Sequence, residues 1–85
     1  MAYQIEVYPD AREQIQALPA VALRALAEVM AMLELTPWTG DPLHAANPDG
    51  AMRAVSFGPA GAGLVVYLIL EDQQRVDVVR VLWVG

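Results

Sequence analysis

Residues 52–85 read MRAVSFGPAGAGLVVYLILEDQQRVDVVRVLWVG, and this stretch decides the fold of the chain. It contains three apolar runs, at residues 52–57, 63–70 and 75–84, which are separated by a glycine-rich segment and by an acidic one. Apolar runs of this length that are bounded by turn residues are typical of β-strands. The second and third runs are apolar on both faces, which predicts central strands covered by helices on one side and by a partner on the other.

Upstream of these strands the apolar pattern changes its period. Residues 3–8 alternate apolar and polar side chains, which predicts a strand with one buried face. A first helix is expected to start at Pro9 and Asp10, with Asp10 as a good N-cap that has a glutamate three residues on, and to end at Pro19. A second helix, with apolar residues at helical spacing, is expected to follow directly and to stop at the Thr36-Pro37 pair.

The predicted order of elements is therefore strand, helix, helix, strand, strand, strand. A chain of 85 residues is expected to form a single domain over residues 1–85. The order predicts an α+β fold in which a four-stranded sheet is backed on one face by a two-helix hairpin.

The composition indicates a protein that needs a partner. The hydrophobic fraction is 56%, above the usual value of about 45 to 50%, so some apolar surface is expected to stay exposed on a domain this small. Ten acidic residues stand against five arginines and no lysine. The resulting formal charge of −5 disfavours unaided binding to a phosphate backbone.

The sequence also narrows the location and the kinds of site to expect. A run of about 18 apolar residues does not occur, and the first strand leaves no room for a signal peptide, so we expect a cytoplasmic protein without a membrane span. Cysteine is absent, which excludes a disulfide framework and a thiol nucleophile. His44 is the only histidine, so no zinc site, no other metal site and no cofactor are expected.

A long surface loop is expected at residues 36–50, because prolines and glycines punctuate this segment and residues 47–50, Asn-Pro-Asp-Gly, read as a tight turn. Loops of this length often carry function. Trp38 is interpreted as a lid over the end of the second helix. Histidine is a residue type that suits acid–base work, so His44 is of interest, although a lone loop histidine is more often exposed and without a role.

Several segments together resemble one protein family. They are Tyr-Pro-Asp-Ala-Arg-Glu-Gln-Ile-Gln-Ala-Leu-Pro at residues 8–19, the helical hairpin, Gly-Leu-Val-Val-Tyr-Leu-Ile at residues 63–69, and Val-Asp-Val-Val-Arg-Val-Leu-Trp-Val-Gly at residues 76–85. In order and spacing they resemble the RelE/ParE superfamily of bacterial type II toxins over nearly the whole chain. The resemblance implies a mainly antiparallel sheet with the first strand beside the last. It also implies an antitoxin protein that wraps the toxin and covers its spare apolar surface.

The resemblance further implies an activity, but most of the residues for it are missing here. Members of the ribonuclease branch cut messenger RNA in the ribosomal A site, with basic residues that activate the ribose 2′-hydroxyl and stabilise the transition state. Arg53 matches the first of two basic positions in the second strand, whereas the second falls on Val55. A further arginine position falls on Leu64. The groups expected beyond the final Val-Gly have no counterpart, because the sequence stops at Gly85.

The candidate catalytic residues are therefore Arg53, Arg80 and His44. Arg53 occupies a matching family position, while Arg80 is nominated only as an available cation in the last strand and has the alternative role of a salt bridge with Asp77 or Glu71. With so few groups, catalysis on free RNA is expected to be feeble. Any growth arrest is expected to depend on Arg53 more than on His44.

Three functions remain open. The first is the toxin of a type II toxin–antitoxin pair, either a weak or atypical ribosome-dependent messenger RNA endoribonuclease or an inhibitor of a target such as gyrase. The second is a non-catalytic antitoxin-binding module on the same fold, and the third is an unrelated small oligomerisation domain. The missing basic residues favour binding over catalysis, and the whole pattern favours the toxin lineage. The expected partners are an antitoxin, the ribosome with its messenger RNA, and a second copy of the chain.

Overall fold

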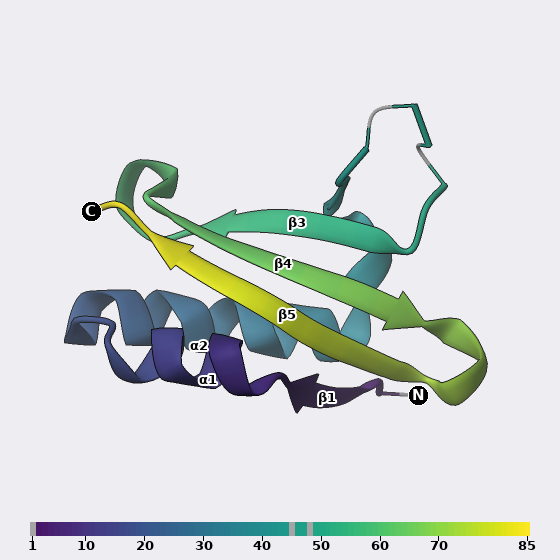
Figure 1. Cartoon of the computed structure of the whole chain (residues 1–85), viewed down its shortest axis with the longest axis horizontal. Coiled ribbons are helices and arrows are strands. Elements are labelled where there is room, and N and C mark those ends of the chain that lie inside the picture. The colour runs from purple at the N-terminus through teal and green to yellow at the C-terminus, as the bar shows by residue number, and fades with distance from the viewer. Residues whose placement is uncertain (1, 45, 48) are drawn as a thin grey trace.

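The computed structural model describes residues 2–44, 46–47 and 49–85. The second helix and the three C-terminal strands match their predicted bounds to within one residue. None of the described helices is both long and apolar enough to cross a membrane. In chain order the elements are β1 (Gln4–Val7), α1 (Pro9–Gln16), α2 (Ala20–Leu35), the 3₁₀ turn η1 (Pro37–Thr39), β2 (Asp41–Pro42), β3 (Met52–Phe57), η2 (Pro59–Gly61), β4 (Gly63–Leu70), η3 (Glu71–Gln73) and β5 (Arg75–Trp83). Figure 1 labels the two helices and the strands β1, β3, β4 and β5.

The sheet is mixed and has five strands, in the order β1-β5-β4-β3-β2. β1 runs parallel to β5, so the first strand lies beside the last, while the other pairs are antiparallel. The prediction of a four-stranded sheet was wrong, because β2 adds a strand in which Asp41 pairs with Ala54 and Pro42 with Arg53. Two residues carry no alternating pattern, and a proline is accepted only at a sheet edge, so periodicity could not reveal β2.

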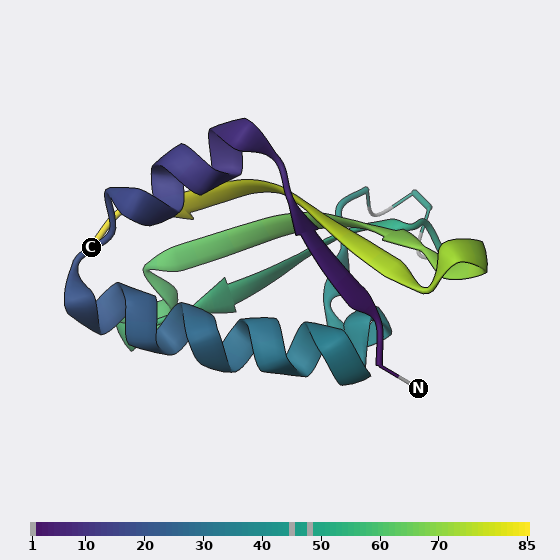
Figure 2. The same cartoon turned by 90° about the horizontal axis from the view of Figure 1, so that it is seen from below.

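Both helices pack on one side of the sheet (Figures 1 and 2), which confirms the α+β prediction. The strands contribute every second side chain to this side, so Val65, Tyr67 and Ile69 of β4 are buried while their neighbours are partly exposed. α2 contributes apolar residues that recur at helical spacing along one stripe. The core consists of Ala11, Leu18, Ala22, Leu26, Leu33, Phe57, Val65, Tyr67, Ile69, Val76, Val78 and Val81.

α1 starts at Pro9, within the predicted start, but its N-cap is not the predicted residue. Pro9 is the first helical residue, and Tyr8 is the N-cap, with φ −67°, ψ 152° and no side-chain cap hydrogen bond. Proline suits this position because its φ is preset for a helix and its missing N–H would have no helical partner there. The prediction of Asp10 as the N-cap was therefore wrong. Asp10 lies in the first turn, where its negative charge is favourable to the helix dipole.

The segment between α2 and β3 is not the unbroken loop that was predicted. It starts with the turn η1 and continues into the edge strand β2. The N–H of Gly50 donates to the carbonyl oxygen of Asn47 at 3.0 Å, in agreement with the turn predicted at residues 47–50. Pro48 of that turn lies outside the described residues.

A β-bulge interrupts β5 near its middle. Tyr67 pairs with Val78, and the preceding residue of β4, Val66, pairs with Arg80, so Val79 is the extra residue. In a regular strand, residues 78 and 80 would lie on the same face. The bulge instead leaves Val78 and Val81 in the core and turns Arg80 to the opposite face of the sheet.

Candidate functional site

We call the face of the sheet that the helices leave uncovered the open face; its centre is apolar and its margins are polar. Its central part is made by the side chains of β4 that alternate with the buried ones. Leu82 is the most exposed of its larger apolar residues, at 40%. By strand pairing, the open face comprises Leu64, Val66, Leu68 and Leu70 of β4, Met52, Ala54 and Ser56 of β3, Arg75, Asp77, Arg80 and Leu82 of β5, Gln4 and Glu6 of β1, and Asp41 of β2.

A polar margin lies along β5 and the end of β1 on this face. The Nε of Arg75 donates to Oδ1 of Asp77 at 2.8 Å, and the hydroxyl of Tyr8 donates to Oδ2 of Asp77 at 3.3 Å. Asp77 is only 3% exposed although no helix covers it. The hydrogen bond to Asp77 raises the pKa of Arg75. Asp77 is thus buried and paired with Arg75, whereas Arg80 and Glu6 on the same margin are exposed.

Arg53 lies on the other face, under the helices. Arg53 pairs with the buried Tyr67 of β4, and only 8% of Arg53 is exposed. Its Nη1 donates to the carbonyl oxygens of Gly40 at 2.9 Å and of Trp38 at 3.2 Å, and its Nε donates to that of Gly50 at 3.1 Å. The guanidinium also lies 4.9 Å from the centre of the Trp38 ring. Arg53 therefore binds the segment between α2 and β3 to the sheet.

The same segment is held at two further points. The hydroxyl of Tyr67 donates to the carbonyl oxygen of Pro37 at 2.6 Å, and burial raises the pKa of this hydroxyl. Trp38, which is 39% exposed, donates from its indole Nε1 to Glu71 at 2.7 Å. Trp38 thus connects the end of α2 with the turn between β4 and β5, beyond the lid that its position in the sequence predicted.

Glu71 is the meeting point of three parts of the chain. Besides Trp38, its carboxylate accepts hydrogen bonds from the hydroxyl of Tyr3 at 2.8 Å and from Nε2 of Gln74 at 2.7 Å. These donors, Trp38 first and Tyr3 next, lower the pKa of Glu71. The hydrogen bond to Glu71 in turn raises the pKa of Tyr3. The acidic turn predicted here is therefore a structural junction.

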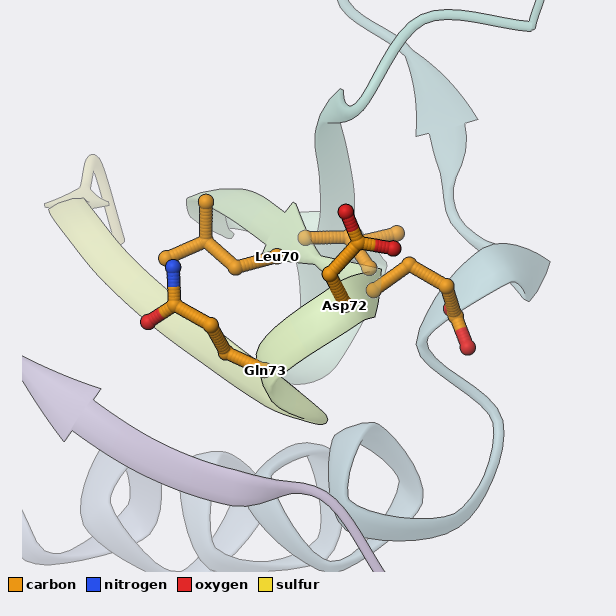
Figure 3. A pocket seen from close by; sticks show the side chains of 5 residues that line it. Leu70, Asp72 and Gln73 are labelled. Carbon is orange, nitrogen blue, oxygen red and sulfur yellow. The ribbon is translucent and has the colours of Figure 1, made fainter.

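A shallow hollow of about 270 Å³ lies beside this junction, where Figure 3 shows Leu70, Asp72 and Gln73 around the turn. Another, of about 320 Å³, lies between α1 and the end of β5. In the latter, the N–H of Val81 donates to Oε1 of Gln14 at 2.7 Å, which caps part of the free edge of β5. Within the described residues, no three His, Cys, Asp or Glu side chains are grouped closely enough to hold a metal ion.

The three candidate catalytic residues are not brought together on one surface. Arg53 is buried on the helix side of the sheet, and Arg80 is exposed on the open face. His44 is exposed in the segment that follows β2. Along the described chain, the ion pair of Asp77 is with Arg75 and not with Arg80.

Neither Tyr8 nor the Arg75–Asp77 pair was predicted from the sequence as part of a site. A carboxylate inside an otherwise apolar strand, as in Val-Asp-Val at residues 76–78, was an available signal, because a charge in such a run needs a partner. Tyr8 gave none, since it continues the alternation of the first strand. Its position beside Asp77 follows from the hydrogen bonds that Tyr8 makes to β5.

Comparison with known proteins gives a consistent result for the fold. No protein-family model and no curated protein sequence matches the chain. Among solved structures, the intact RelBE toxin–antitoxin complex of E. coli contains a chain that superposes with a TM-score of 0.80 at 14% identity, with 99% of both chains covered.

Two further complexes agree. The RelBE2 toxin–antitoxin complex of Mycobacterium tuberculosis gives a TM-score of 0.71 at 22% identity and covers 99% of this chain and 100% of that one. The archaeal RelE–RelB complex of Pyrococcus horikoshii OT3 gives a TM-score of 0.66 at 16% identity. This match covers 100% of this chain and 98% of that one. Bacterial and archaeal structures thus share the architecture over essentially their full lengths, and this chain has the fold of the RelE toxins.

Proposed function

We propose that this chain is the toxin of a type II toxin–antitoxin pair and that its open face binds the antitoxin. The observation that carries the proposal is the fold likeness to RelE chains from three toxin–antitoxin complexes, which extends over nearly all of each chain. The open face supports it, because a contiguous apolar surface such as Leu64 to Leu70 on a small domain is typical of an interaction site. An antitoxin that covers this face would also bury Leu82.

We further propose that the toxin acts in the cytoplasm as an atypical endoribonuclease on ribosome-bound messenger RNA. A metal-free ribonuclease needs a cation at the phosphate and a group that accepts the 2′-hydroxyl proton. Arg80 is the exposed cation of the open face, and His44 is the one exposed imidazole. Arg53 is engaged with backbone carbonyls, so we assign its influence on activity to holding the segment that leads to His44.

The test is induced expression in a bacterial host, with growth and cleavage of ribosome-bound messenger RNA as the two measurements. Wild type is expected to arrest growth and to cleave within ribosomes, and the protein encoded by an adjacent short reading frame is expected to relieve the arrest. Arg80→Ala is expected to reduce cleavage strongly. Arg12→Ala, which removes an exposed arginine of α1, is the matched control and is expected to behave as wild type.

The outcomes separate the parts of the proposal. Growth arrest without cleavage would reject the ribonuclease activity and leave a toxin with another target. Full cleavage by Arg80→Ala would reject the assigned role of Arg80. Normal growth on expression, together with no binding to the adjacent gene product, would reject the toxin role itself.

A further inference from the structure

Four residues form a row straight across the open face, and we call it the charged row. Arg80 of β5 pairs with Val66 of β4, Val66 pairs with Ala54 of β3, and Ala54 pairs with Asp41 of β2. The two ends are exposed and of opposite charge, and the two middle side chains are small and apolar. The row exists because the bulge at Val79 turns Arg80 to this face.

The charges at the two ends are available to another molecule. The ion pair found within the described residues joins Arg75 and Asp77, so it uses neither Arg80 nor Asp41. Three strand spacings separate β5 from β2, which places the two ends about 14 Å apart. This exceeds the screening length of about 8 Å at physiological salt, so Arg80 and Asp41 of one chain do not neutralise each other.

A row with a cation at one end and an anion at the other is complementary to a reversed copy of itself. We propose that a second copy of this chain packs face to face on the open face, about a two-fold axis that runs along the strands between β3 and β4. This axis reverses the row, so that Arg80 lies against the partner's Asp41, and Asp41 against the partner's Arg80. An axis along the row would instead oppose two arginines, and the charges therefore select between the two arrangements.

The apolar side chains fit the same arrangement. Between the charged ends, Val66 lies over the partner's Ala54, and in the next row Leu68 lies over the partner's Met52, because Met52 and Leu68 are themselves paired. The axis keeps the strands of the two sheets aligned, as in other face-to-face sheet packings. Small residues in the middle of the row allow the two sheets to approach closely. The dimer also accounts for a hydrophobic fraction of 56% in a chain this short.

The inference goes beyond the proposed function and does not depend on it. If the chain is a toxin, dimer formation and antitoxin binding use the same face, so the two are mutually exclusive. The free toxin is then a dimer. In the antitoxin complex, the antitoxin covers the open face of each toxin chain in place of the second toxin copy. Sedimentation of the free chain tests the dimer, and growth arrest tests the toxin, so either can fail alone.

The experiment is a charge-reversal series measured by analytical ultracentrifugation. Wild type is expected to be a dimer. Arg80→Glu places two acidic pairs in the interface and Asp41→Arg places two basic pairs, so each variant alone is expected to weaken the dimer by about tenfold or more. An equimolar mixture of these two variants restores two opposite-charge pairs and is expected to form a heterodimer. Arg12→Glu, on α1, is the control and is expected to dimerise as wild type does.

The mixing step makes the inference falsifiable even where a variant folds poorly. The same pairs can be co-expressed with two different tags and co-purified, which reads out association inside the cell. A monomeric wild type, a dimer unaffected by either reversal, or single variants that fail to associate with each other would each overturn the inference. Restored association of Arg80→Glu with Asp41→Arg, and of neither with itself, would support it.

Discussion

Replacing Arg53 by alanine is expected to release the segment between α2 and β3 from the sheet. The guanidinium donates to the carbonyl oxygens of Gly40, Trp38 and Gly50, and it stacks on the Trp38 ring. Alanine removes these donors together and leaves the carbonyls to find water. Since only 8% of Arg53 is exposed, water cannot simply replace the side chain where it lies.

The size of the effect follows from the burial of each hydrogen bond. The bond to Gly40 is buried and involves a charged donor, for which a net contribution of about 1.5 to 3 kcal/mol is typical. The bonds to Trp38 and Gly50 are partly buried and contribute about 0.5 kcal/mol each. Arg53→Ala is therefore expected to lower the free energy of unfolding by about 2.5 to 4 kcal/mol. Arg53→Lys keeps the charge but not the fork of donors, and it is expected to lie in between.

Urea unfolding followed by tryptophan fluorescence is the assay, because Trp38 lies in the released segment, while Trp83 reports on the end of β5. Arg24→Ala, which removes an exposed arginine of α2, is the control and should change the stability by less than about 0.5 kcal/mol. If Arg53→Ala unfolds at the same urea concentration as wild type, the anchoring role is refuted. A loss of growth arrest in a stable Arg53→Ala protein would instead support the catalytic role that the sequence predicted for Arg53.

Three further predictions concern the same end of the molecule. Hydrogen bonds to the Glu71 carboxylate lower its pKa, so the stability that Glu71 contributes is present above the unfolded pKa of about 4.3 and is lost as the pH falls through the folded value. Urea midpoints measured across this pH range should fall less in Glu71→Gln than in wild type. Tyr67→Phe leaves the carbonyl of Pro37 without its buried donor and should lower the free energy of unfolding by about 1 to 3 kcal/mol in urea titrations, whereas an unchanged midpoint would show that water replaces the hydroxyl. Gly40→Ala places a methyl group against the hydroxyl of Tyr67 and should be among the most destabilising single changes, with a melting temperature well below that of an exposed change such as Ala31→Gly.

The sequence predicted the elements that have a strong period and missed those that depend on one contact. The strands over residues 52–83 were found because apolar runs bounded by turn residues specify them, and α2 was found from its repeating apolar stripe. β2 was missed because Asp41 and Pro42 become a strand only through their pairing with β3. The N-cap of α1 was misassigned to Asp10 because Pro9 takes the first helical position and Tyr8 before it makes no side-chain cap.

The candidate site could be predicted less well, because strand periodicity does not say which face a residue takes. Arg53 and Arg80 both lie in apolar strands, but the pairings place them on opposite faces. The bulge that decides this for Arg80 lies within a run of similar residues, Val78-Val79, so no change in residue type marks it. The charged row likewise joins residues from four strands, and only the register of all three pairings aligns them.

The parallel pairing of β1 with β5 also sets an order of events during synthesis. Gln4 pairs with Arg75, so β1 can pair with β5 only after nearly the whole chain has been synthesised. At about 5 to 20 residues per second, a ribosome needs several seconds to make the intervening stretch. During that time the amphipathic helices have no sheet to cover, and closing so long a loop is among the slower steps in folding. The open face is therefore complete only when the last strand arrives.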